Sequence, residues 1–213
     1  MRRSLMLVAV LALIPVAAHA DPILINGNFE LGPPMGGLHD VDVPAGSDAI
    51  PGWVVTRGGV DYLGVPWDVF EGEHGIDLDR RSPGGIQQTF DTEAGRTYAV
   101  FFELSGNPNP VGGSMLKSLR VSVGSFTQDY TFDSTGQAED SLLWDHIRFS
   151  FVATGAASTL SFASLSDSSS SYGALIDHVR VHHTPDRGTS LLLLGIGLVG
   201  VLIGLRAWRK RRQ

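Results

Sequence analysis

Between Asp21 and Thr184 the chain alternates apolar and polar residues in short runs, and no window keeps a 3.6-residue apolar period for three helical turns. A period of two residues is typical of a strand with one buried face. Clusters of Gly, Pro, Asn and Ser separate the runs. Short strands without helical crossovers predict an antiparallel β-sandwich or barrel. The alternating runs span residues 97–104, 118–123, 146–152, 158–164 and 174–182.

The composition excludes several classes of protein. The chain has no cysteine, which excludes disulfides and Cys-ligated zinc or iron-sulfur sites. From Asp21 to Thr184 there are 21 Asp and Glu residues against 8 Lys and Arg residues, which leaves a charge of −13. So acidic a segment is a poor partner for nucleic acid or anionic lipid. Its length suits one domain, placed at 21–183, that buries a core without disulfides.

The first 20 residues have the pattern of a secretory signal peptide. Two arginines open the chain and precede an apolar run that ends at Val16. Ala18 and Ala20 then stand at the −3 and −1 positions, which predicts cleavage before Asp21 and export of the domain. An uncleaved membrane anchor is the alternative.

Residues 184–213 form a separate segment after the domain. The uncharged stretch 188–205 would be about 27 Å long as a helix, close to the thickness of a bilayer's hydrocarbon core. A basic cluster that contains Trp208 follows it. The positive-inside rule then leaves the C-terminus in the cytoplasm and the domain outside. We therefore expect a transmembrane helix that tethers the domain at an outer surface.

The same tail resembles a class of bacterial sorting signal. Pro185, Asp186 and Gly188 precede the apolar stretch and the terminal arginines, in the order of the PEP-CTERM signals that exosortases recognise. Thr184 and Arg187 depart from the Val-Pro-Asp-Ser-Gly form of the signature. The resemblance implies an exosortase-type sorting enzyme as partner, cleavage near the Pro-Asp pair, and release to the cell surface or extracellular matrix. A permanent tail anchor is the alternative.

Seven short blocks run through the domain in a recognisable order. They lie at residues 25–30, 50–53, 60–64, 75–79, 85–90, 104–108 and 172–179. In this order they resemble the choice-of-anchor C family, a domain of unknown function in secreted bacterial proteins with a related form in plant cell-wall proteins. The resemblance implies a galactose-binding-like jelly-roll sandwich, the fold of many carbohydrate-binding modules, and extracellular polysaccharide as the ligand.

The first and last of these blocks also point to a metal. Asn-Gly-Asn-Phe-Glu and Ile-Asp-His-Val are similar to the first and last strands of several carbohydrate-binding modules, in which an acidic residue of each strand holds a structural calcium ion. The corresponding residues are Glu30 and Asp177. Two carboxylates with backbone carbonyls are the hard oxygen ligands that Ca²⁺ requires. The alternative is that both residues cap strand ends or face water.

Aromatic rings are the usual platforms for sugars, because the apolar face of a pyranose stacks on a ring while its hydroxyls bind polar groups. Trp67 follows a Gly-Val-Pro sequence, so we expect an exposed ring in a loop there. Tyr62, Asp61 and Arg80 are the expected polar and aromatic partners nearby. Trp53 follows a Pro-Gly turn and is interpreted as a core residue.

No motif supports catalysis. The chain has no Gly-x-Ser-x-Gly elbow, no His-Glu-x-x-His and no Walker loop, and nothing fixes two carboxylates at the separation of a glycosidase. His178, His182 and His183 lack a further ligand, so a solvated strand end explains them better than a metal site. The sequence thus predicts a non-catalytic exported module that binds polysaccharide. The alternative is a structural protein of the envelope or biofilm matrix that acts through protein–protein contacts.

Overall fold

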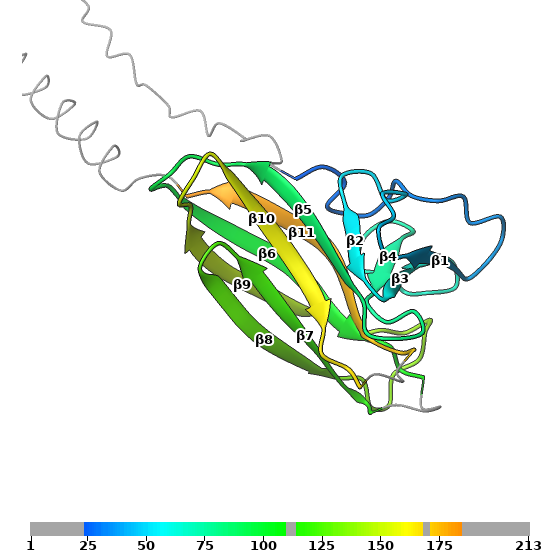
Figure 1. Cartoon of the computed structure of the whole chain (residues 1–213). Coiled ribbons are helices and arrows are strands. Elements are labelled where there is room, and N and C mark those ends of the chain that lie inside the picture. Colours follow the sequence, from blue (N-terminus) through cyan, green and yellow to red (C-terminus); the bar gives the residue numbers. More distant parts are fainter. Residues whose placement is uncertain (1–23, 110–113, 168–170, 185–213) are drawn as a thin grey trace, which may run out of the picture.

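Two antiparallel β-sheets pack face to face in the computed structural model, which describes residues 24–109, 114–167 and 171–184 (Figure 1). This described part contains eleven strands and no helix, so the predicted all-β sandwich is confirmed. One sheet has the order β1-β3-β4-β11-β6-β9, and the other has the order β2-β5-β10-β7-β8. The strands are β1 (Asp40–Pro44), β2 (Val54–Arg57), β3 (Gly59–Leu63), β4 (Gly75–Asp77), β5 (Gly85–Asp91), β6 (Thr97–Gly106), β7 (Leu116–Val123), β8 (Phe126–Asp133), β9 (Asp145–Val152), β10 (Ala157–Ser164) and β11 (Ala174–His183).

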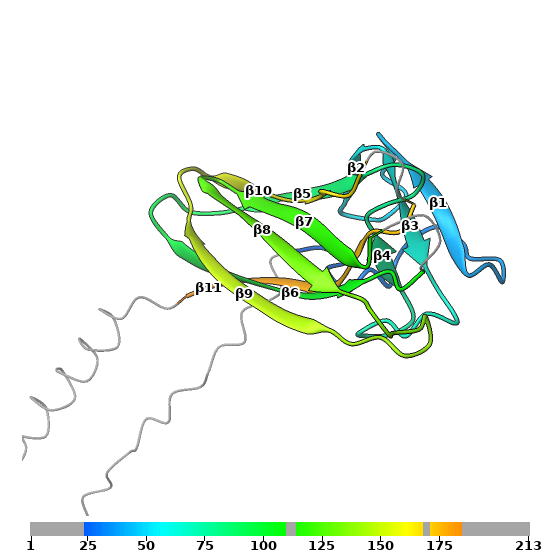
Figure 2. The same ribbon diagram turned by 90° about the horizontal axis from the view of Figure 1, so that it is seen from below.

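The long strands make the two layers of the sandwich. Figure 2 shows β5, β7, β8 and β10 in one layer and β6, β9 and β11 in the other, with the short strands β1 to β4 gathered at one end. The five runs predicted from alternation correspond to β6, β7, β9, β10 and β11, with ends that agree within two residues. The alternation pattern did not predict strands β3 and β4. Both are buried on both faces, so their sequences lack a period of two.

A chain of aromatic rings joins the two layers. Trp53 lies 5.2 Å from Phe29 and 6.2 Å from Phe162, and Phe162 lies 5.1 Å from Phe102, all measured between ring centroids. All four rings are buried, and the indole N–H of Trp53 donates to the carbonyl oxygen of Asn26 at 3.0 Å. Trp53 is therefore a core residue, as its turn context predicted.

Strand β11 carries a bulge that sets the direction of its side chains. The register with β6 shifts between Asp177 and Arg180, and His178 has a φ of 49°. One extra residue in a strand lets the residues on both sides of it face the same way. Asp177 and Arg180 therefore both face away from the core, while Val179 between them faces inward.

The segment that precedes β1 crosses β11 at this bulge. The amide of Val179 donates to the carbonyl oxygen of Gly27 at 2.7 Å. A Cβ atom at Gly27 would lie 2.0 Å from the carbonyl oxygen of Val179, so only glycine allows the two backbones to approach this closely. The N-terminal segment thus covers the part of β11 that β4 does not pair.

Several predicted segments lie outside the described residues. These are the signal peptide at 1–20, the sorting residues Pro185, Asp186 and Gly188, and the apolar stretch 188–205. Within the part of the chain that the structure describes, no helix has the length and hydropathy needed to cross a bilayer.

The contact at Gly27 gives a test of the fold. We expect Gly27→Ala to destabilise the domain by about 1–3 kcal/mol, because the new methyl group must push apart two hydrogen-bonded backbones. Gly155→Ala is the matched control, since the nearest atom to a Cβ there is 3.9 Å away. Thermal unfolding of the full chain measures both. Equal melting temperatures for the two variants would contradict the close crossing at β11.

Candidate functional site

An exposed aromatic ring stands at the centre of a small cluster on the outer face of the six-stranded sheet. Phe70 lies between β3 and β4 and its side chain is 38% exposed. Its ring packs edge-on against Trp144, His146 and His178, with ring centroids 6.2, 5.6 and 5.5 Å away. We call these four residues the Phe70 cluster. Two other chain segments, residues 144–146 and His178, thus hold one apolar ring in place at the surface.

Carboxylates pair with both histidines of the cluster. His178 forms an ion pair with Glu71, the residue after Phe70. His146 forms an ion pair with Glu103, which lies directly opposite it on β6 and is 3% exposed. The cluster therefore combines an apolar ring with polar groups whose orientation is fixed by their partners.

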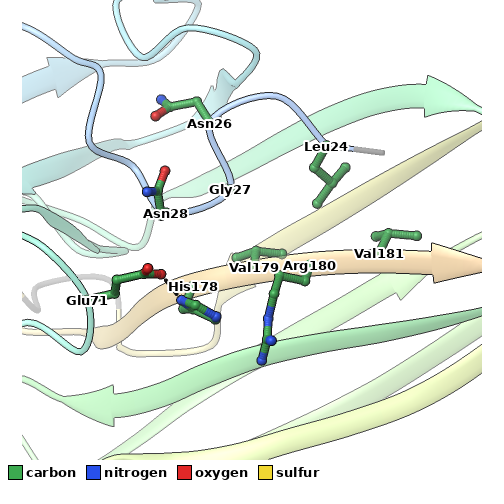
Figure 3. A pocket seen from close by; sticks show the side chains of 9 residues that line it. All are labelled: Leu24, Asn26, Gly27, Asn28, Glu71, His178, Val179, Arg180 and Val181. Carbon is green, nitrogen blue, oxygen red and sulfur yellow. Dashed lines mark ion pairs between the residues drawn. The ribbon is translucent and has the colours of Figure 1, made fainter. Parts of the chain in front are cut away.

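Two hollows flank the 70–74 loop. One, of about 250 Å³, is lined by Glu71, His178, Arg180 and the N-terminal segment from Leu24 to Asn28 (Figure 3). Figure 3 shows Glu71 and His178 pointing toward one another, and Arg180 leaving β11 on the side away from the N-terminal segment. The other hollow, of about 640 Å³, lies against Glu30, Tyr62, His74 and the 32–39 segment.

The predicted calcium ligands lie at the same loop. Glu30 accepts backbone hydrogen bonds from Glu73 and His74 at 3.0 and 3.1 Å. Asp177 accepts one from Glu71 at 2.9 Å. Burial, and to a smaller extent the charges of Glu30 and Glu71, raise the pKa of Asp177 to about 7, although its backbone hydrogen bonds act in the opposite direction. Among the residues that the structure describes, no three His, Asp or Glu side chains converge as a metal-binding set.

The predicted stacking residues do not share one surface. Trp67 is only half-buried, but it packs on Leu63, Leu142 and Leu175, and its indole N–H is buried with no hydrogen-bond partner among the described residues. Tyr62 is 1% exposed and donates its hydroxyl hydrogen to the carbonyl oxygen of Phe29 at 2.7 Å. The expectation of an open ring at either position is corrected accordingly, because both rings pack against the protein itself.

Asp61 and Tyr62 are neighbours in β3 and therefore face opposite sides of the sheet. The structure brings Asp61 instead beside Arg80, since both interact with Asp42 of β1. Asp42 lies opposite Asp61, which in turn lies opposite Asp77 of β4. Three aspartates thus form one row across β1, β3 and β4.

Burial decides the charge of this row. The pKa of Asp61 is raised to about 8 by burial first and by the charge of Asp77 second. The pKa of Asp77, which accepts from Asn107 at 2.7 Å, is raised to about 7 mainly by burial. The hydrogen bond from Arg80 lowers the pKa of Asp42 instead. Near neutral pH, Asp61 and Asp77 therefore retain protons that exposed aspartates would release.

A buried lysine lies close to the end of this row. Lys117 is 2% exposed and donates to the carbonyl oxygen of Tyr172 at 2.8 Å. Burial lowers its pKa, and the charges of Asp77 and Asp79 oppose that change. Both carboxylate oxygens of Asp79 are buried without a hydrogen-bond partner in the described part of the chain. Lys117 and these aspartates therefore form a buried cluster in which the acidic groups offset part of the cost of burying the ammonium group.

Sequence reasoning missed Phe70 and His146 at the surface. Their segments are separated by more than 70 residues, and the residues meet only because β9 and β11 flank β6 in one sheet. The only feature of the local sequence that indicated an aromatic site here was the Pro-Trp-Asp loop that precedes Phe70.

Comparison with protein families identifies the domain. A family model described as "Protein of unknown function (DUF642)" matches residues 22–182. The expected membership of the choice-of-anchor C family is therefore wrong, and neither that family nor a PEP-CTERM signal is found. The seven blocks that carried the resemblance all lie within the matched range. Their buried residues, such as Trp53 and Ile86, fill the core of the sandwich.

Two relatives share the sequence of this domain. Halomucin of Haloquadratum walsbyi is 31% identical over 143 residues, which is 67% of this chain and 2% of halomucin. The Arabidopsis thaliana protein DUF642 L-galactono-1,4-lactone-responsive gene 2 is 29% identical over 188 residues, which is 82% of this chain and 49% of the plant protein. The chain thus spans less than half the length of either relative.

Solved structures share the architecture. The cyclase Fisc from Fischerella sp. TAU has a TM-score of 0.50 at 17% identity, over 78% of this chain and 98% of the cyclase. The module TmCBM61, solved in complex with beta-1,4-galactotriose, has a TM-score of 0.49 at 17% identity, over 78% of this chain and all of the module. The arabinose-bound α-L-arabinofuranosidase MgGH51 also has a TM-score of 0.50, at 11% identity over 78% of this chain and 27% of that enzyme, so the fold occurs in proteins with different activities.

The aspartate row predicts how stability varies with pH. Folded Asp61 keeps a proton up to about pH 8, whereas the unfolded chain releases it near about pH 4. The folded state thus binds more protons, so the free energy of unfolding falls as the pH rises from 5 to 8. We expect Asp61→Asn to reduce this loss and to raise the melting temperature at pH 8 by about 2–4 °C.

Asp129→Asn is the matched control for this experiment. The hydrogen bond from Arg120 lowers the pKa of Asp129, so its stabilising effect is lost only below the pH range of the test. Thermal unfolding of the full chain at pH 5 and pH 8 compares the variants. An Asp61→Asn protein that loses as much stability as the wild type over this range would overturn the assignment of the buried proton.

Proposed function

This chain belongs to the DUF642 family, and from that premise we propose that its domain is a non-catalytic module that binds extracellular polysaccharide through the Phe70 cluster. The observation that carries the proposal is the exposed ring of Phe70, held by three other rings and bordered by His–carboxylate pairs. A pyranose ring presents an apolar face and a rim of hydroxyls, and this surface offers both matching chemistries.

The geometry favours binding over catalysis. Glu71 and Glu103 each pair with a histidine, and Asp177 is 0% exposed and accepts backbone hydrogen bonds. A glycosidase needs two carboxyl groups that face the scissile bond from opposite sides, with one of them free to donate a proton. Here the carboxylates serve to orient neighbouring groups. We therefore assign the cluster a binding role.

The proposed setting of the module is outside the cytoplasm. The basic and apolar start of the chain supports a cleaved signal peptide at 1–20, and the stretch 188–205 with its basic end supports a membrane tether. A galactose-binding-like jelly roll on such a tether would present its outer sheet face to polysaccharide at the cell surface or in the surrounding matrix.

The proposal includes a structural Ca²⁺ held by Glu30 and Asp177. These carboxylates bind amides at both ends of the 71–74 turn, and a Cβ atom at Gly72 would meet the Glu30 carboxylate at 2.3 Å. The turn is thus wrapped between two acids from distant parts of the chain, and backbone carbonyls would complete the set of oxygen ligands. Bound Ca²⁺ would offset the repulsion between the two acids and stiffen the loop that carries Phe70.

Polysaccharide binding is tested by removing the central ring. The full chain is titrated with neutral polysaccharides in affinity electrophoresis. We expect Phe70→Ala to weaken binding about tenfold or more, because the stacking surface is lost. Leu116→Ala, which removes an apolar side chain that is 58% exposed on the opposite sheet, should bind like the wild type.

Failure of every polysaccharide to bind would refute the proposal. Self-association of the chain in the same experiment would then favour the alternative, a structural protein that acts through protein–protein contacts. Equal affinities of the wild type and Phe70→Ala would place the binding site elsewhere on the domain.

The calcium site is tested by thermal unfolding with Ca²⁺ or EDTA. At a hundredfold excess over its Kd, Ca²⁺ should raise the melting temperature by roughly 5–10 °C. Glu30→Gln should abolish most of this shift, since the amide oxygen still accepts the two backbone hydrogen bonds but the charge is gone. Glu93→Gln, at an exposed ion pair with Arg96, serves as the control. An unchanged melting temperature of the wild type with Ca²⁺ would refute the proposed calcium site.

A further inference from the structure

A row of three side chains lies beside the Phe70 cluster on the outer face of the six-stranded sheet. Arg180 of β11 lies opposite Phe101 of β6, which lies opposite Arg148 of β9. The guanidinium carbon of Arg148 is 5.1 Å from the centroid of the Phe101 ring, and that of Arg180 is 5.5 Å away. One aromatic ring is therefore flanked by two guanidinium groups from the neighbouring strands. We call these three residues the Phe101 row.

These arginines differ from the other cations of the domain. Of the eight Lys and Arg residues between positions 21 and 184, six have an ion pair or hydrogen bond, and Arg148 and Arg180 have neither among the described residues. Both are exposed. The six engaged residues are Arg57, Arg80, Arg81, Arg96, Lys117 and Arg120. In a domain with a charge of −13, these two guanidinium groups thus lie on either side of Phe101 on one face.

The acidic groups near the row are already engaged. Glu103 follows Phe101 by two residues on β6 and pairs with His146, and Glu71 pairs with His178. On the other side, His182 packs against Phe101 at 6.0 Å between ring centroids. No carboxylate that the structure describes approaches either guanidinium within 4 Å. The row therefore presents ten N–H donors in two forks, with an apolar ring between them.

The row continues the proposed sugar-binding surface. Arg148 follows His146 by two residues on β9, so their side chains leave the same face about 7 Å apart. Arg180 follows the bulge that carries His178 and lines the hollow shown in Figure 3 together with Glu71. A polymer bound over Phe70 would reach the Phe101 row with its next residues.

We propose that the Phe101 row is a subsite for the carboxylate of a uronic acid, so that the module selects acidic polysaccharides. This inference rests on the polysaccharide-binding function proposed above. A guanidinium fork binds a carboxylate through two parallel hydrogen bonds, a geometry that a neutral hydroxymethyl group does not match. The Phe101 ring supplies an apolar surface for the sugar between the two forks.

The test uses two glycans with the same backbone, one with free carboxylates and one with these groups methyl-esterified. The full chain is titrated with polygalacturonate and with its fully methyl-esterified form at the same ionic strength. We expect the wild type to bind polygalacturonate about tenfold more tightly. The double variant Arg148→Gln/Arg180→Gln should lose this preference while it keeps the affinity for the esterified polymer.

A control separates the local effect from net charge. Arg120→Gln removes a positive charge from β7 of the opposite sheet, so it should keep the preference for polygalacturonate. Equal binding of both polymers by the wild type, or an unchanged preference in the double variant, would overturn the uronate subsite and leave the binding function intact. Absence of binding to any polysaccharide would refute the proposed function itself, and this inference with it.

Discussion

A single extra residue in β11 decides which side chains reach the outer face of the six-stranded sheet. In a regular strand Asp177 and Arg180 would face opposite sides, because side chains alternate with a period of two. The bulge between them turns both outward and leaves Val179 in the core. The amide of Val179 at the same bulge donates to the carbonyl oxygen of Gly27. The positions of the N-terminal segment, the 70–74 loop, the Phe70 cluster and the Phe101 row therefore all depend on this register shift.

The excess of acidic side chains is accommodated in two ways, by protonation in the interior and by pairing with histidines at the surface. Inside, Asp61 and Asp77 keep protons because burial raises their pKa, and Lys117 lies close to Asp77 and Asp79. At the surface, Glu71 and Glu103 pair with histidines. These pairings hold the Phe70 cluster in place and leave the guanidinium groups of the Phe101 row without acidic partners. Two guanidinium groups on one face of an acidic protein thus remain available for the carboxylate ligand proposed above.

The candidate site could be predicted only in part. The sequence indicated that aromatic and acidic residues would form it, and it brought Glu30 and Asp177 forward as a pair that does meet at one loop. It failed for Tyr62, whose ring points into the core from the strand position next to Asp61, and for Trp67, which is half-buried and packs against leucines. Whether a ring in a loop faces solvent depends on what packs over it, and that information is not local.

The sequence by itself determined the all-β architecture, because alternation within β6, β7, β9, β10 and β11 leaves each strand one apolar face to bury. It also contained the trace of the bulge, since the inward residues Ile176 and Val179 are three positions apart instead of two. The tertiary structure alone decided which strands are neighbours. Phe70 meets His146, and Arg148 meets Arg180 across Phe101, only because β6 lies between β9 and β11, and no local pattern specifies that order.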